Sequence, residues 1–183
     1  MVIADGAYAK RPFLIRVMKT GAVVVSRLRK DAALFDLPEA VKNPGKGRPR
    51  KYGENRVSLA RRGSHRKGWT TARMVLYGLE RTVTYKTFLA TYPPAGGVIR
   101  VVVVKRTPEL FADSPSAWVA FFCTDADVPA AMIIEAVSDR SAIEQNFHDV
   151  KEVHGARRTG QTELRNRSFP TSLSARTSTT NVL

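Results

Sequence analysis

The sequence has little cysteine and no long apolar run, and these two absences exclude several classes of protein. Cys123 is the single cysteine among 183 residues, so no internal disulfide can form. The longest apolar runs, such as residues 101–104 and 119–123, are too short to span a bilayer, and the N-terminus lacks a cleavable signal pattern. We therefore expect a reduced, cytoplasmic protein with no membrane partner. In that setting we interpret Cys123 as a small buried apolar side chain.

Acidic residues and histidines are scarce as well. The chain has 16 Asp and Glu against 30 Lys and Arg, which gives a formal net charge of +14. Its three histidines have no Cys or His partner at the spacing of zinc ligands, so we expect no zinc site. The excess of positive charge favours a polyanionic partner such as nucleic acid.

The first 28 residues predict a strand, a helix and a second strand. The opening apolar run ends in Asp5 and Gly6, which indicates a buried strand that places an acid at its carboxyl end, where α/β sheets bind ligands. Residues 10–20 have the apolar spacing of an amphipathic helix, and Gly21 ends it. Residues 22–28 then return to a strand pattern.

A long helix is predicted late in the chain, over residues 128–154. This stretch contains no Gly, and its single Pro, Pro129, stands at the front with Asp127 as the expected N-cap.

Three charged residues fall on one stripe of this helix. Glu144 and Lys151 follow Arg140 by four and eleven residues. At 3.6 residues per turn, these separations place them about 40° and about 20° past whole helical turns from Arg140. Ile133 and Phe147 lie on the same side, so the stripe holds a carboxylate between two cations where the helix should pack. An ordinary ion pair on a surface helix is the other interpretation of these residues.

The middle of the chain predicts antiparallel strands after a basic loop. Residues 34–68 are rich in Pro, Gly and basic side chains and indicate mostly loop, with a short strand at 57–60. Residues 73–77, 82–91 and 98–105 are β-branched and aromatic runs bounded by turn formers.

The positive charge is concentrated in this basic loop. Residues 42–73 contain eleven Lys or Arg and one acid, Glu54. Such a run is usually a solvated surface, but near acids that repel DNA it is better explained by contacts to phosphates. Residues 47–53, G-R-P-R-K-Y-G, also resemble an AT-hook core, whose arginines enter a narrow minor groove. The candidate DNA-binding residues are Arg48, Arg50, Lys51, Arg61, Arg62, Arg66 and Lys67.

Two blocks together resemble the DDE transposases of bacterial insertion sequences, in the group with a Y-x2-R-x3-E-x6-K signature. The first is D-G-A-Y at residues 5–8 followed by V-V-S-R-L-R-K-D-A at residues 24–32. The second is R-x3-E-x6-K, formed by Arg140, Glu144 and Lys151. The Tyr of the signature is replaced by Val137. The resemblance covers residues 2–155.

This resemblance implies a ribonuclease-H-like domain in which three carboxylates hold two Mg²⁺ ions for DNA strand cleavage and transfer. Asp5 would be the second acid and Glu144 the third, both as catalytic metal ligands. Arg140 and Lys151 would position Glu144 or hold the DNA backbone. The partners implied are double-stranded DNA, as transposon ends and target, and a second subunit in a homodimer.

The first acid of such a site should precede Asp5 in the chain. Asp31 and Asp36 follow Asp5, so neither is assigned that role. We therefore expect a fragment that lacks the first catalytic strand and does not cleave DNA by itself. Residues 168–183 are half Ser or Thr and predict a disordered tail, consistent with an interrupted reading frame.

The expected fold class is α/β, a partial ribonuclease-H-like domain interrupted by a mainly antiparallel β insertion. Two other functions stay open: a DNA-binding protein without catalysis that uses the loop from Gly47 to Gly53, and an inactive gene remnant. The predicted segments are a ribonuclease-H-like part at 1–33, a basic β insertion at 34–116, a second ribonuclease-H-like part at 117–156 and a tail at 157–183.

Overall fold

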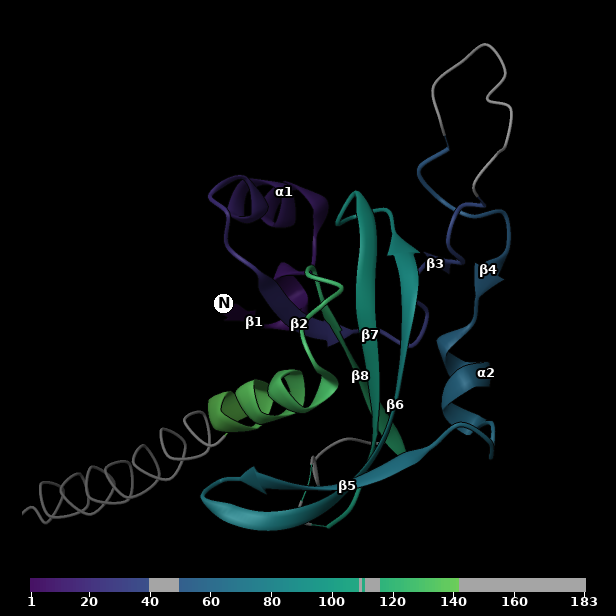
Figure 1. Ribbon diagram of the computed structural model, residues 1–183. Helices are drawn as coiled ribbons and strands as arrows, with labels where there is room; N and C mark the ends of the chain where they lie inside the picture. The colour runs from purple at the N-terminus through teal and green to yellow at the C-terminus, as the bar shows by residue number, and fades with distance from the viewer. Residues whose placement is uncertain (40–49, 109, 111–115, 142–183) are drawn as a thin grey trace, which may run out of the picture. The chain divides into compact units, whose positions relative to one another are not determined.

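A mixed sheet runs through the part of the chain that the computed structural model describes, which is residues 1–39, 50–108, 110 and 116–141 (Figure 1). Within these residues the sheet has eight strands in the order β1-β2-β8-β7-β6-β3-β4, and β5 pairs with β6 outside this path. The strands are β1 Val2–Ala4, β2 Val24–Leu28, β3 Leu34–Phe35, β4 Arg56–Val57, β5 Thr70–Leu76, β6 Leu79–Tyr92, β7 Gly97–Lys105 and β8 Trp118–Cys123. The predicted α/β class is confirmed.

The first two strands are parallel, and the other strand pairs are antiparallel. The helix α1, Arg11–Lys19, connects β1 to β2, which is the crossover that parallel neighbours require. It ends at Thr20, and Gly21 follows with a φ of +79°, a backbone conformation that glycine adopts without strain. The predicted strand, helix and strand at the front of the chain are therefore confirmed.

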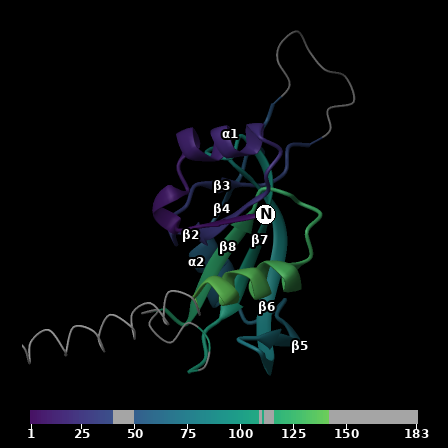
Figure 2. The same ribbon diagram turned by 90° about the vertical axis from the view of Figure 1, so that its left-hand side faces the viewer.

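Apolar side chains cover both faces of the sheet. Val24 and Val25 are neighbours on β2, yet they belong to two separate buried clusters, because successive side chains of a strand point to opposite faces. Leu14 of α1 packs in the first cluster. Ile133 and Val137 pack in the second, from a helix that covers residues 130–141 and whose axis runs across the strands (Figure 2).

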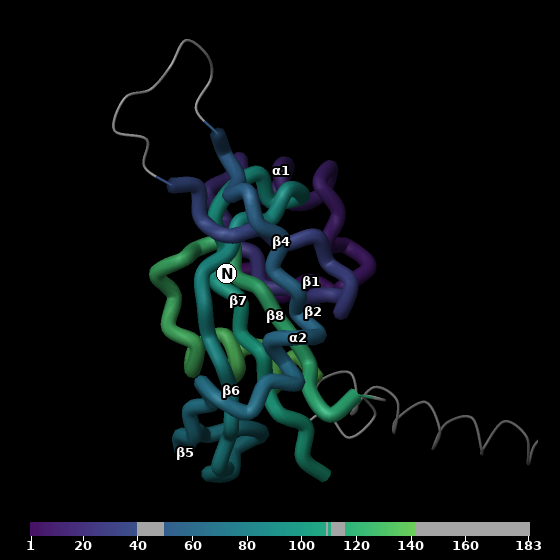
Figure 3. Tube along the Cα trace, turned by 90° about the vertical axis from the view of Figure 1, so that its right-hand side faces the viewer, coloured from purple at the N-terminus to yellow at the C-terminus, as the bar shows by residue number. Residues whose placement is uncertain are grey.

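The long strand β6 has two different partners along its length. Residues 79–85 pair with β5, and residues 85–92 pair with β7. Tyr77 and Gly78 form the turn between β5 and β6 with φ values of 55° and 72°, as in a two-residue hairpin loop. Figure 3 shows this hairpin at one end of β6. The predicted antiparallel strands of the middle region are thereby confirmed.

Strand β8 contains the apolar run at residues 119–123 and ends at Cys123. The Cys123 side chain has no exposed surface, so the interpretation as a buried apolar residue is confirmed. Burial is the main cause that raises the pKa of its thiol above the usual value. The thiol therefore carries little of the reactive thiolate form at neutral pH.

Three local predictions are wrong. Residues 57–60 are not a strand: Val57 ends β4, and the helix α2, Leu59–Ser64, follows. The strand β1 is an edge strand and is not buried, with Val2 38% exposed, since among the described strands it pairs with β2 alone. The late helix begins at residue 130, so Pro129 rather than Asp127 precedes its first turn.

The sheet draws strands from three of the four predicted segments, and the boundaries of those segments stay a prediction. Among the described residues, no helix combines the length and the apolar character needed to cross a membrane.

Candidate metal and DNA sites

Asp5 lies directly after β1 with an exposed side chain. Its Oδ1 accepts a hydrogen bond of 2.7 Å from the backbone N–H of Ala7, which caps a short 3-10 helix over Gly6–Tyr8. The hydroxyl of Ser26 on β2 donates to the carbonyl oxygen of Asp5 at 3.2 Å. Because β1 and β2 are parallel, the end of β2 lies at the same edge of the sheet as Asp5.

Arg140 connects the late helix to the strand that carries Asp5. Its guanidinium donates a hydrogen bond of 3.1 Å to the carbonyl oxygen of Ile3, two residues before Asp5. The neighbouring helical residue Val137, which stands where the family signature has Tyr, is 7% exposed and packs in the core. Arg140 is therefore held at β1 by a contact that spans most of the chain.

The other predicted metal and helix residues are not placed. Glu144 and Lys151 lie outside the residues that the structure describes, so their positions stay a prediction. Within the described residues, no three Asp, Glu, His or Cys side chains gather closely enough to hold a metal ion. Asp5 is thus the one member of the predicted pair of metal ligands whose surroundings are known.

A basic cavity borders the turn that follows Asp5. Its volume is about 360 Å³, and it is lined by Gly6, by Arg27, Arg29 and Lys30, and by one acid, Asp31, which forms an ion pair with Arg29. Strand register aligns Ala4 with Ser26, so the next residue on each strand, Asp5 and Arg27, reaches the same edge. A Cβ atom at Gly6 would lie 3.4 Å from the Arg27 carbonyl oxygen, an ordinary van der Waals contact, so the turn after Asp5 packs against β2. These cations are not among the predicted site residues, although the block V-V-S-R-L-R-K contains them.

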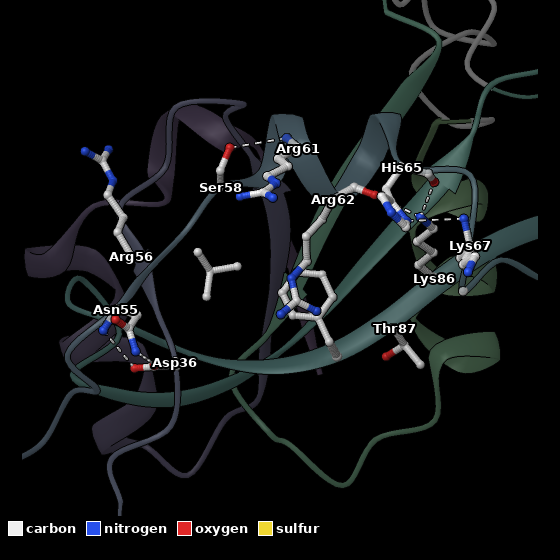
Figure 4. A pocket seen from close by; sticks show the side chains of 13 residues that line it. Asp36, Asn55, Arg56, Ser58, Arg61, Arg62, His65, Lys67, Lys86 and Thr87 are labelled. Atoms are coloured by element: carbon white, nitrogen blue, oxygen red, sulfur yellow. Dashed lines mark hydrogen bonds between the residues drawn. The ribbon is translucent and has the colours of Figure 1, made fainter.

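A second and larger basic cavity lies between α2 and β6, and we name it the basic groove (Figure 4). It has a volume of about 620 Å³ and is open to solvent. Three of the predicted DNA-binding residues line it, Arg61, Arg62 and Lys67. The other basic lining residues, Arg56, His65 and Lys86, are not among the predicted DNA-binding residues.

The remaining predicted DNA-binding residues are not brought into this groove. Arg50 is exposed and forms an ion pair with Glu54, four residues away. Lys51 and Arg66 are exposed and are not among the lining residues. Arg48 lies outside the described residues, together with Gly47 and Pro49 of the AT-hook-like stretch.

One acid, Asp36, lines the basic groove, and its carboxylate is already hydrogen-bonded within the protein. Its carboxylate accepts hydrogen bonds from Asn55, at 3.2 Å from the backbone N–H and at 2.7 Å from the side-chain amide. These bonds hold the segment before β4 against the end of β3. The charge that the groove presents to solvent is therefore predominantly positive.

The helix α2, which carries Arg61 and Arg62, begins with an N-cap. The Ser58 hydroxyl oxygen accepts a hydrogen bond of 3.2 Å from the N–H of Arg61. At Gly63 the helix packs against the ring of Trp118, where an added Cβ would lie 2.3 Å from Cε2. Only a residue without a side chain fits this contact.

We expect the Gly63→Ala variant to be less stable than the wild type. Alanine favours the helix by up to about 1 kcal/mol, but forcing a methyl group into the Trp118 ring costs about 1–3 kcal/mol. Thermal unfolding measures the change. The exposed residue Ser64 provides a control on the same helix, and Ser64→Ala should change stability by less than about 0.5 kcal/mol. A Gly63→Ala variant as stable as the wild type would show that α2 does not pack here.

An acid at the carboxyl edge of parallel strands could contribute one ligand to a metal ion, and cations lining a cavity beside it could attract a phosphate. The family model for the transposase DDE domain matches residues 1–169, so the chain belongs to the transposase DDE domain family. The predicted family is therefore confirmed. Members of this family have a ribonuclease-H-like fold and act on DNA with divalent metal ions. Among curated proteins and solved structures, no significant match was found.

Proposed function

We propose that this chain serves DNA transposition, in which strands at transposon ends are cleaved and joined to target DNA. Asp5 and Glu144 are the metal ligands in this proposal, and Mg²⁺ is the ion. The hydrogen bond from Arg140 to the Ile3 carbonyl oxygen is the observation that supports it most, because it fixes the R of the R-x3-E motif beside β1. In the sequence, Glu144 follows Arg140 by four residues, about one helical turn.

The side chain of Asp5 fits a role as ligand of a hard cation. It is exposed, and Ala7 occupies one of its two oxygens with a single hydrogen bond, which leaves lone pairs on both oxygens free to bind a metal. Bound Mg²⁺ would activate the attacking water or DNA 3′-hydroxyl and stabilise the leaving oxygen. The carboxylates themselves contribute the negative charge that retains the ion.

The cations near Asp5 have separate roles in this proposal. Arg140 is a positioning residue, because its guanidinium is bound to the backbone of β1. Arg27 and Lys30 line the cavity next to Asp5 and would hold a DNA phosphate there. Lys151 would contact the DNA backbone, as the family motif implies. A homodimer on paired DNA ends completes the proposal.

A manganese titration followed by NMR tests whether Asp5 and Glu144 share a metal. Mn²⁺ should broaden the amide signals of residues 4–6 and of the residues around Glu144 over the same range of metal concentration. In Glu144→Gln both effects should weaken together, because an amide binds a divalent cation less strongly than a carboxylate. Glu135→Gln, on the same late helix, is the matched control and should leave the broadening unchanged.

One result of this titration would contradict the shared metal site. If Glu144→Gln leaves the broadening at residues 4–6 unchanged, the two acids do not share a metal and the catalytic part of the proposal fails. A DNA-binding protein without catalysis is then the second candidate, and the basic groove is the observation that favours it.

A further inference from the structure

Lys86 is a lysine on β6 that the fold buries almost completely. Its side chain is 8% exposed, and its Nζ donates hydrogen bonds to the carbonyl oxygens of Arg62, at 2.9 Å, and His65, at 2.6 Å. The ammonium also lies 4.5 Å from the centre of the Trp69 ring. Burial, and then the nearby Arg62 guanidinium, lower the pKa of Lys86. Burying a cation costs free energy unless its protons are bonded, and these two carbonyl oxygens supply such bonds to Lys86.

The two carbonyl groups bound by Lys86 belong to the end of α2 and the residue after it. Helix C-termini leave carbonyl oxygens unpaired and favour a cation there. The Trp69 indole N–H donates to the same His65 carbonyl oxygen at 3.0 Å. Figure 4 shows Lys86 beneath His65, with the bond between them drawn. Lys86 therefore holds the end of α2 and the following loop onto β6.

This attachment sets the positions of the cations that border the basic groove. Arg62 stacks its guanidinium over the Phe88 ring at 4.4 Å, and the backbone N–H of Lys67 donates to His65 Nδ1 at 3.3 Å. Arg61 stands one residue before Arg62 on α2. If Lys86 released the end of α2, the charges of Arg61, Arg62 and Lys67 would remain but would no longer converge.

The groove suits an extended phosphate chain. It is open to solvent, and its lining is cationic apart from Asp36, whose carboxylate is bound by Asn55. Exposed guanidinium and ammonium groups along an open surface favour successive backbone phosphates, which are contacted without regard to sequence. A double helix presents such phosphates at regular intervals.

The groove is also far from the edge that carries Asp5. In the sheet order, β6 is four places from β1, which corresponds to about 19 Å at a strand spacing of about 4.8 Å. A single phosphate of a DNA duplex cannot contact the basic groove and the Asp5 edge at the same time. Any DNA in the groove is therefore bound away from the position of cleavage, at a distance of about six base pairs along a duplex axis.

We propose that Lys86 is a positioning residue that assembles the basic groove into a site for the sugar–phosphate backbone of duplex DNA, apart from the Asp5 edge. Lys86 itself contacts no phosphate. The inference rests on the proposed function in taking DNA as the partner, and it adds a binding site and the residue that forms it.

The salt dependence of DNA binding separates positioning from direct contact. Each phosphate contact that is lost lowers the slope of log affinity against log salt by about 0.9. Arg61→Ala, which removes one exposed groove cation, should lower the slope by about that amount. Lys86→Met should lower it by about 2 or more, because Arg61, Arg62 and Lys67 lose their placement together. Fluorescence anisotropy with a 20-base-pair duplex between about 50 and 200 mM salt measures these slopes.

Two variants control for charge and for the hydrogen bonds. Lys105→Met removes an exposed lysine at the end of β7, outside the groove, and should leave the slope nearly unchanged. Lys86→Arg keeps donors for both carbonyl groups and should restore most of the wild-type slope. Thermal unfolding of each variant shows whether it is folded.

Each other outcome overturns a named part of the proposal. If Lys86→Met matches Arg61→Ala, Lys86 is a direct contact and not a positioning residue. Should Lys86→Met fail to fold, Arg61→Ala and Lys67→Ala decide the groove alone, and unchanged slopes in both overturn it. Equal binding of duplex RNA or polyglutamate overturns the choice of partner. The manganese titration is independent of these slopes, so a failure of the groove and a failure of the metal site are distinguishable.

Discussion

The Asp5→Asn variant is expected to lose divalent-metal binding at the end of β1 while it keeps the wild-type fold. An asparagine side-chain oxygen can accept the hydrogen bond that Ala7 N–H now donates to Asp5 Oδ1, so the cap of the short 3-10 helix survives. The substitution removes the negative charge of the carboxylate, and a hard divalent cation binds a neutral amide far less strongly than a carboxylate. The substitution therefore separates the structural role of Asp5 from the metal-binding role.

Calorimetric titration with Mn²⁺ and thermal unfolding measure the two roles of Asp5. Asp5→Ala should lose both metal binding and the cap, at a stability cost of about 1 kcal/mol. Asp31→Asn is the matched control, because Asp31 is an exposed acid that pairs with Arg29 and lines the cavity near Gly6. Should Asp5→Asn bind Mn²⁺ like the wild type, or should Asp31→Asn lose binding instead, Asp5 is not the ligand.

Elements with strong local signals could be predicted from the sequence. Residues 118–123 form β8, and their β-branched and aromatic side chains are typical of a strand buried on both faces. Gly21 marked the end of α1, since a left-handed residue is needed there. The helix α2 had a readable signal as well, a capping Ser58 followed by Leu-Ala-Arg-Arg, but the basic and Gly-rich surroundings favoured a loop.

Features that depend on contacts between distant segments could not be predicted. Three apolar residues at the front of the chain give the same pattern in a central strand and in an edge strand, so the exposure of β1 was missed. Thr82, Thr84 and Lys86 alternate along β6 as a solvent-facing row would. The end of α2 covers this row only at Lys86, which turns an ordinary surface lysine into a buried one. No pattern in the local sequence predicts that the end of α2 covers Lys86.

The candidate site likewise has residues that the sequence could predict and contacts that it could not. The R-x3-E-x6-K spacing is a local pattern, so the sequence alone identifies Arg140 as a candidate site residue. The bond from Arg140 to Ile3 joins residues that are 137 positions apart, so only the folded chain could provide it. The basic groove likewise combines β4, α2 and β6, which meet through the sheet and not through the sequence.

Raising the salt concentration from about 50 to about 200 mM should weaken the binding of duplex DNA by about 150-fold. The groove presents four exposed cations that could each neutralise a phosphate, Arg56, Arg61, Arg62 and Lys67. Four phosphate contacts correspond to a slope of about −3.6 in log affinity against log salt, because each contact releases a condensed counterion. The net charge of +14 adds attraction at long range, which salt screens as well.

Duplexes of different base composition distinguish this phosphate binding from an AT-hook. Phosphate contacts carry no sequence information, so A·T-rich and G·C-rich 20-base-pair duplexes should bind with equal affinity and equal slope. An AT-hook reads the narrow minor groove of A·T tracts, so it would prefer the first duplex and lose that preference in Arg48→Ala. An affinity that does not respond to salt would exclude both modes, since neither can bind DNA without displacing counterions from its phosphates.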